Sequence, residues 1–226
     1  MLSGWKAALG AGLAGALIGG AVVAWTARPS VRDYLLENPE VIPEAMERLH
    51  DREAAKVVRA NKALIETPFA GAWGGAKDGD VVLVEFFDYA CGFCRKSNPD
   101  IDRLLEEDGK LKVVWRDWPV LGPDSEAAAH SSLAAAKAGR FKAFHDRLFA
   151  AGRPSGPAVA EARGAAQVTE PVDAEEAQAE LRKNFELARA LNATGTPTFV
   201  VGERVLQGAV GYEALKQAIA EARKRA

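Results

Sequence analysis

Cys91 and Cys94 are the only cysteines of this 226-residue chain, and Gly92 and Phe93 separate them. The apolar run 81–87 before them is rich in β-branched and aromatic residues and predicts a buried strand. Apolar residues at helical spacing follow, so we expect Cys91 in the first turn of a helix. The free N–H groups and dipole of a helix N-terminus stabilise an anion, and can lower a thiol pKa from about 8.5 to about 3.5–7.5. Cys94 lies one turn later, within reach of a disulfide with Cys91, so the pair predicts redox chemistry.

A pair of cysteines can also be half of a metal site. A closed zinc site needs two further ligands, usually Cys or His. The histidines His50, His130 and His145 are scattered, and none is near the pair in sequence. We therefore expect no metal ion and no cofactor, and we interpret His130 and His145 as packed or surface residues. Sequestration of copper or zinc by the two thiols remains an alternative, as does a scaffold that holds unfolded chains without using the thiols.

The charge of the chain is nearly balanced, with 29 basic and 31 acidic residues. A nucleic-acid-binding protein normally has a basic face, so we expect no nucleic-acid partner. The length is sufficient for one or two domains with a sizeable core.

The segment 7–25 carries no charge and consists mainly of Ala, Gly, Leu, Ile and Val. Its length suits a membrane-spanning helix, and residues 1–28 are therefore predicted to be an anchor or a signal segment. Either would carry the rest of the chain across the membrane. Two cysteines in an exported protein lie where disulfides persist, so we expect a periplasmic location, with a tether at 7–25 or with secretion after cleavage.

Residues 29–70 predict a helical region. Ser30 can cap a short helix that ends at Asn38, and Pro39 suits the first position of a second helix. Apolar residues continue at intervals of three and four, at Ile42, Met46, Leu49, Ala54, Val57, Ala60 and Leu64. This stripe could dock on the rest of the protein, but the Gly-rich stretch 70–75 reads as a linker or turn. We therefore predict a stalk that joins copies of the chain through residues 31–66.

Residues 76–226 predict an α/β catalytic domain. Strands are expected at 81–88 and 111–118, joined by a helix that breaks near Pro99, and a connection of this kind implies that the two strands are parallel. Residues 124–191 read as a helical insertion of three or four helices. Strands return at 198–201 and 204–206, and a last helix starts near Gly211.

Glu85 is the only charged residue in the apolar strand before the cysteines. A buried carboxyl group there should have a raised pKa and could relay protons to or from Cys94. Lys112 or Arg116 could be its counter-charge. A strand residue that reaches solvent is the alternative.

Three parts of the sequence together resemble the DsbA-like branch of the thioredoxin superfamily. They are the run from Val84 to Cys94, the stretch 115–125 that begins Trp-Arg-Asp-Trp-Pro, and the sequence Gly-Thr-Pro-Thr-Phe at 195–199. Residues 31–40 are similar to the N-terminal region of proteins of the suppressor-of-copper-sensitivity protein C (ScsC) type.

The resemblance implies a thioredoxin fold with a helical insertion, and a cis peptide bond before Pro197. It implies that Pro197 shields the sulfurs and that the backbone of Thr196 pairs with an extended substrate. It further implies exchange of protein disulfides through Cys91 and Cys94, with unfolded or wrongly bonded proteins as substrates. A membrane redox partner would reset the pair. Isomerase or reductase work is our first interpretation, and a disulfide-donating oxidase is the alternative.

Overall fold

The computed structural model describes residues 30–225. The segment 7–25, where we predict an anchor or signal, lies outside these residues. Among the helices of residues 30–225, none is both long enough and apolar enough to cross a membrane. The chain divides into two compact units, one that ends at Leu49 and one that starts at His50.

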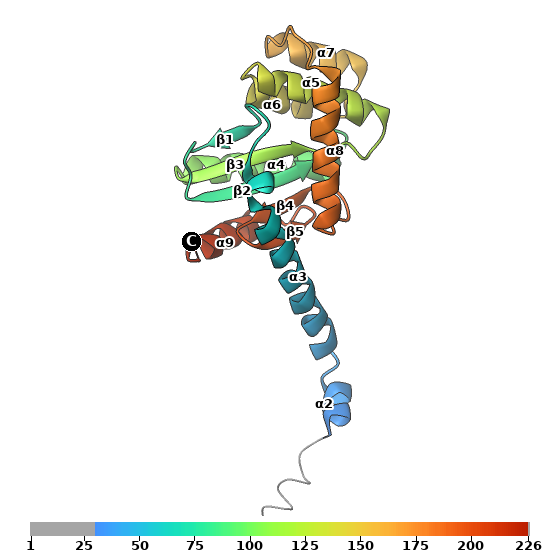
Figure 1. The fold of residues 1–226 in the computed structure, drawn as a ribbon, viewed down its shortest axis with the longest axis vertical. Coiled ribbons are helices and arrows are strands. Elements are labelled where there is room, and N and C mark those ends of the chain that lie inside the picture. The colour runs from blue at the N-terminus through green and yellow to red at the C-terminus, as the bar shows by residue number, and fades with distance from the viewer. Residues whose placement is uncertain (1–29, 226) are drawn as a thin grey trace, which may run out of the picture. The chain divides into compact units, whose positions relative to one another are not determined.

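A five-stranded mixed sheet is the centre of the unit that starts at His50 (Figure 1). Its strand order is β1 (Trp73–Gly75), β3 (Leu111–Asp117), β2 (Val81–Phe87), β4 (Thr198–Val201) and β5 (Arg204–Gln207). Strands β2 and β3 are parallel, as predicted, and the other neighbours are antiparallel. The register places Glu85 between Trp115 of β3 and Phe199 of β4. Residues in register point to the same face of a sheet, so these three side chains share one face.

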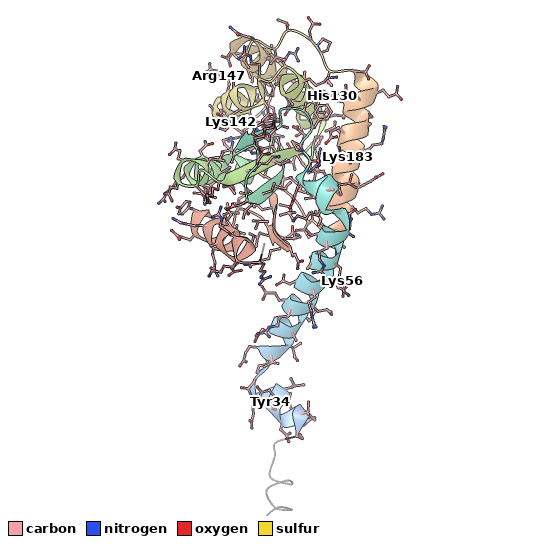
Figure 2. The ribbon with its side chains drawn as sticks, turned by 60° about the vertical axis from the view of Figure 1, so that its left-hand side comes forward. Tyr34, Lys56, His130, Lys142, Arg147 and Lys183 are labelled. Carbon is pink, nitrogen blue, oxygen red and sulfur yellow. The ribbon has the colours of Figure 1, made fainter. Side chains whose placement is uncertain are left out.

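Six helices complete this unit together with the end of a seventh. Helix α4 (Gly92–Glu107) follows β2, and α9 (Tyr212–Arg223) closes the fold. The predicted helical insertion consists of α5 (Pro123–Lys137), α6 (Phe141–Ala151), α7 (Gly156–Ala165) and α8 (Ala174–Ala190). Helices α5, α6 and α7 pack together, and α8 runs from them along the sheet (Figure 1). Lys142 of α6 (labelled in Figure 2) pairs with Asp102 of α4 at 2.9 Å and so ties the insertion to the first helix of the domain.

The two faces of the sheet are covered by different helices. Leu83, Phe87 and Val113 belong to a core shared with α4, α9 and the insertion. Val84, Phe86 and Val114 belong to a second core, shared with α8 and the second half of α3 (Val41–Glu66). The alternation of side chains along each strand explains this division, because odd-numbered and even-numbered residues of β2 point to opposite faces.

The N-terminal helices follow the prediction in outline. Helix α2 (Val31–Glu37) is capped by Ser30, whose Oγ accepts a hydrogen bond from the backbone N–H of Asp33. Pro39 lies in a turn and α3 starts two residues later, at Val41, so the prediction of Pro39 as the first helical residue is wrong.

The apolar side of α3 also differs from the prediction. Val58 and Ile65 are buried against the domain, whereas Ala60 and Leu64 of the predicted stripe are exposed. The buried side of the helix is displaced from the predicted stripe, because the second core takes Val58 and Ile65, the residues that directly follow Val57 and Leu64. The second half of α3 is therefore part of the catalytic unit, and the exposed remainder of the stripe begins at Ile42.

The Gly-rich stretch 70–75 is not a linker, because Trp73–Gly75 pairs with β3 as the edge strand β1. A Cβ atom on Gly74 would lie 3.0 Å from the Trp115 ring, so glycine permits this close packing. Pro99 lies inside α4, which continues through it to Glu107, so the predicted break is also wrong.

Candidate active site

Cys91 is the N-cap residue of α4. It lies three residues after Asp88, which directly follows the end of β2. Its backbone N–H bonds to the Asp88 carbonyl oxygen at 3.0 Å, which fixes the tight turn between strand and helix. Only 6% of Cys91 is exposed and Cys94 is fully buried, and both are free thiols. Cys91 is the less buried of the two, so its sulfur is the one that an incoming disulfide can reach.

The surroundings of the two thiols separate their pKa values. The pKa of Cys91 is lowered to about 5, mainly because the Cys94 thiol donates to its sulfur; the Thr196 side chain and the N–H groups of Cys94 and Phe93 add to this, against the effect of burial. The pKa of Cys94 is raised far above the ordinary value by burial, by its hydrogen bond to Cys91 and by the charge of Glu85. At neutral pH Cys91 is a thiolate and Cys94 a thiol, and the thiolate is the nucleophilic form.

The loop before β4 lies against Cys91. The Thr196–Pro197 peptide bond is cis, as the resemblance implies, and Pro197 is buried. In its protonated form, Cys91 donates its S–H to the carbonyl oxygen of Thr196 at 3.1 Å. Residues separated by more than one hundred positions in sequence are thus brought together at the sulfur.

Glu85 is fully buried on the same face of the sheet as Trp115 and Phe199. Within residues 30–225, neither of its carboxylate oxygens has a hydrogen-bond partner. Burial raises its pKa to about 8, and the negative charges of Cys91 and Asp102 add to the rise. The carboxyl group is therefore protonated at neutral pH, and the alternative of a side chain that reaches solvent is wrong.

The predicted counter-charges do not pair with Glu85. Lys112 and Arg116 are in register with Val82 and Phe86, so they lie on the opposite face of the sheet. The Lys112 ammonium lies over the Trp73 ring, 5.6 Å from its centroid, and Arg116 bonds to groups of α3 and α8. Their exclusion depends on the register between β2 and β3, which the structure gives.

Asp88 is a buried residue of this region that the sequence analysis missed. Its Oδ1 accepts the Ala90 N–H at 2.7 Å, and its Oδ2 accepts the N–H groups of Val120 and Leu121 at 2.8 and 3.0 Å. The Asp88 side chain therefore holds the turn that leads to Cys91 against the loop that follows β3. An acidic residue directly after an apolar strand and three positions before a cysteine was the available signal.

A cluster of buried polar side chains joins the end of β3 to the helical insertion. The Tyr89 hydroxyl donates to Ser132 at 3.1 Å and lies 3.3 Å from Nδ1 of His145, and Ser132 donates to Asp117 at 3.0 Å. Burial raises the pKa of Asp117 well above its usual value and lowers that of His145 well below its own. His145 is therefore neutral at pH 7. His145 is thus a packed residue, while His130 on α5 is partly exposed (Figure 2).

Cation binding finds little support in this geometry. Among residues 30–225, no three side chains of His, Cys, Asp or Glu come together in a way that could hold a metal ion. The two thiols would need ligands from elsewhere to complete a tetrahedral site.

Comparison with known proteins gives the family. A model of the DSBA-like thioredoxin domain matches residues 82–220, which is more than half of the chain. The chain belongs to the DsbA-like thioredoxin family. It is therefore an enzyme of the thiol–disulfide oxidoreductase class, of the DsbA/ScsC type. A second model, the copper resistance protein ScsC N-terminal domain, matches residues 28–56.

Individual relatives agree with this assignment. A linker-deletion mutant of ScsC from Proteus mirabilis is 28% identical, with a TM-score of 0.74 over 87% of this chain and 92% of that one. A periplasmic thioredoxin-like protein from Salmonella enterica serovar Typhimurium is 25% identical, with a TM-score of 0.68 over 72% and 95%. Disulfide bond formation protein D of Bacillus subtilis is 26% identical over 64% of this chain and 73% of its own.

Other curated relatives are much longer than the matched region. The Na(+)/H(+) antiporter NhaA 3 of Salinispora tropica is 29% identical over 66% of this chain. This chain spans about a quarter of that antiporter's length, since the match covers 24% of it.

Proposed function

We propose that the chain exchanges disulfides in unfolded or wrongly bonded proteins through Cys91 and Cys94, and that it works mainly as an isomerase or reductase. The observation that carries this proposal is the division between an accessible Cys91 of lowered pKa and a buried Cys94 of raised pKa. The Cys91 thiolate attacks first, and Cys94 stays protonated until the second step.

The reaction begins when the Cys91 thiolate attacks one sulfur of a substrate disulfide. The substrate S–S bond breaks, a Cys91–substrate disulfide forms, and the released substrate thiolate takes up a proton. Cys94 then loses its proton and attacks the Cys91 sulfur, which releases the second substrate sulfur. The substrate has gained two electrons and Cys91–Cys94 is oxidised. In isomerisation, another substrate thiol attacks the mixed disulfide instead, so no net oxidation occurs.

Glu85 is proposed to accept the proton of Cys94. The Cys91 thiolate raises the pKa of Glu85, and this charge disappears once Cys91 is bonded to substrate. The pKa of Glu85 then falls. A lower pKa favours the charged carboxylate at the step where Cys94 must lose its proton. Formation of the mixed disulfide thereby prepares the next step.

Substrate binding is proposed to use Thr196 and the apolar side chains near the cysteines. The Thr196 backbone can pair with an extended segment, a mode that grips unfolded chains with little sequence preference. Phe93, Val120 and Leu121 are exposed by 65%, 41% and 48%. The bonds from Asp88 hold Val120 and Leu121 beside the turn that carries Cys91. These apolar surfaces can contact the hydrophobic residues that an unfolded protein exposes.

The isomerase direction depends on a proposed oligomer. The N-terminal unit exposes large apolar residues that a monomer would leave in water, namely Val31, Tyr34, Leu36, Ile42, Met46 and Leu49. The match to the ScsC N-terminal domain covers the same region. Joined copies would place several active sites around one substrate, which favours repeated exchange over a single transfer.

A disulfide-donating oxidase is the second candidate. The observation that favours it is the lowered pKa of Cys91, because stabilising the reduced form makes the Cys91–Cys94 disulfide a stronger oxidant. For either direction we propose a periplasmic location, a tether or signal at residues 7–25, and a membrane partner that resets the cysteines.

Four measurements test these proposals. Reactivation of scrambled ribonuclease and reduction of insulin should both be lost in Cys91→Ser, while Cys94→Ala should accumulate mixed disulfides. Unchanged turnover in Cys91→Ser would overturn the assignment of the nucleophile. Thiol trapping in cells separates the directions, since mostly reduced cysteines indicate an isomerase or reductase and mostly oxidised cysteines an oxidase.

The oligomer has its own test, and the structure sets its boundary. Deleting residues 31–49 should convert an oligomer into a monomer and shift activity from isomerase towards oxidase. A deletion that continues to residue 66 would also remove Val58 and Ile65 from the core and would test stability instead. Light scattering that shows a monomer before any deletion would overturn the proposed oligomer.

A further inference from the structure

Gln207, the last residue of β5, makes a set of side-chain contacts that the chemistry above leaves unused. Its Oε1 accepts hydrogen bonds from the Thr194 N–H at 3.2 Å, the Thr194 hydroxyl at 3.4 Å and the Thr198 hydroxyl at 3.1 Å. Its Nε2 donates to the Asn192 carbonyl oxygen at 3.3 Å. One amide therefore contacts the loop 192–198 at three separate residues.

The same loop carries Thr196 and the cis bond to Pro197. On its inner side, the buried Thr198 hydroxyl also donates to the Gly195 carbonyl oxygen at 2.7 Å. The Gly208 N–H, next to Gln207, donates to the Pro197 carbonyl oxygen at 2.8 Å. The loop is thus held on both sides of Thr196 by the end of β5, while Thr196 itself faces Cys91.

We propose that Gln207 is a positioning residue, which holds the loop 192–198 so that Thr196 stays in contact with the Cys91 sulfur. The side chain is exposed on the edge strand and touches neither sulfur within residues 30–225, so it acts through the loop. Gln207 is exposed, so packing in the core does not require a glutamine there. The hydrogen bonds require a side-chain amide, because Nε2 must donate while Oε1 accepts from more than one group.

The effect at Cys91 follows from what Thr196 contributes. Its side chain is among the groups that lower the pKa of Cys91. A loop that moves more freely spends less time with Thr196 at hydrogen-bond distance, and this contribution falls. The pKa of Cys91 then rises and a smaller fraction of it is thiolate at pH 5, although the residues that touch the sulfur are unchanged.

This inference rests on the proposed role of Cys91 as the nucleophile. The experiment compares Gln207→Met, which keeps the length of the side chain but not its hydrogen bonds, with the wild-type chain. The matched control is Gln217→Met on α9, where an exposed glutamine donates to Glu221 at 2.9 Å away from the loop. The readout is the rate of alkylation of Cys91 by iodoacetamide from pH 3.5 to pH 8 in the reduced protein, which keeps Cys94 because its thiol lowers the pKa of Cys91 and is itself buried and protonated in this range.

We expect Gln207→Met to raise the pH midpoint of alkylation, so that the rate at pH 5 falls about twofold, while the control follows the wild-type curve. Thr198→Val removes the hydroxyl that Gln207 accepts, and adding Gln207→Met to it should lower the rate by less than Gln207→Met does alone. Identical curves for Gln207→Met and wild type would overturn the positioning role. If wild-type Cys91 itself titrates like an ordinary cysteine, the proposed nucleophile fails instead, so the two failures are distinguishable.

Discussion

Replacing Glu85 by glutamine should stabilise the reduced protein, and the gain should depend on pH. The carboxyl group has a pKa of about 8 in the folded chain and an ordinary value of 4.5. Between these values the folded state holds a proton that the unfolded state has released, so stability falls as pH rises through this window. Glutamine resembles the protonated carboxyl group in shape and does not titrate, so it removes this fall.

The size of the effect follows from the two pKa values. The Glu85 carboxyl group lowers the free energy of unfolding by about 1 kcal/mol near pH 5 and by about 3 kcal/mol near pH 7. Above pH 8 it lowers the free energy of unfolding by about 4 to 5 kcal/mol. The buried glutamine amide has its own cost, because no partner is present for it, but this cost is independent of pH. The difference between the two proteins should therefore grow by about 2 kcal/mol from pH 5 to pH 7.

Urea unfolding of the reduced proteins at pH 5, 7 and 8.5 measures this difference. Titrating groups that do not interact with residue 85 change both proteins alike, so subtraction removes their contributions and leaves those of residue 85 and of its coupling to Cys91. The same pair of proteins in a Cys91→Ser background is the control, and there the difference should grow less steeply because the thiolate charge is gone. A difference that stays constant from pH 5 to pH 8.5 would refute both the raised pKa and the proton transfer built on it.

Further predictions concern the residues that hold the site together. Replacing Asp88 by Ala leaves the N–H groups of Ala90, Val120 and Leu121 without their acceptor, so we expect a loss of about 3 kcal/mol in urea unfolding and faster proteolysis of the loop after β3. Arg116→Met should cost about 3–5 kcal/mol by the same measurement, because it leaves the buried Glu180 without this partner and frees the end of α3. Unfolding within 1 kcal/mol of wild type would contradict either assignment.

Much of the fold could be predicted because its signals are local. The apolar run of β2, the helical spacing after Cys94 and the length of the connection together determine a parallel pair with Cys91 at a helix N-terminus. The insertion was visible as a long stretch of helix-forming residues between two strands. Glu85 stood out because it is the one charged residue of an apolar strand, which favoured a buried carboxyl group over the alternative of a side chain that reaches solvent.

Three features were missed for one cause, which is that the deciding partner lies far away in sequence. β1 was hidden because Gly74 and Gly75 resemble a linker. The Trp115 ring explains why Gly74 must be small, and the Leu111 carbonyl oxygen together with a positive φ explains Gly75. The docking side of α3 depends on the second core, whose members come from four other elements. Gln207 carries no local signal, since an exposed glutamine at a strand end is ordinary until the loop beside it is known.

Arg116 and Glu85, on neighbouring central strands, show why one buried ionisable residue is paired and the other is not. Arg116 donates to the carbonyl oxygens of Ile65 and Thr67, which end α3, and pairs with Glu180 of α8, so its charge ties two helices to one face. A group with this task must keep its charge, and each partner helps it do so. Glu85 on the other face has no such partners among residues 30–225. A cation beside it would hold its pKa low whatever happened at Cys91. Without one, its protonation can follow the charge of the Cys91 sulfur, which is the property that a proton acceptor for Cys94 requires.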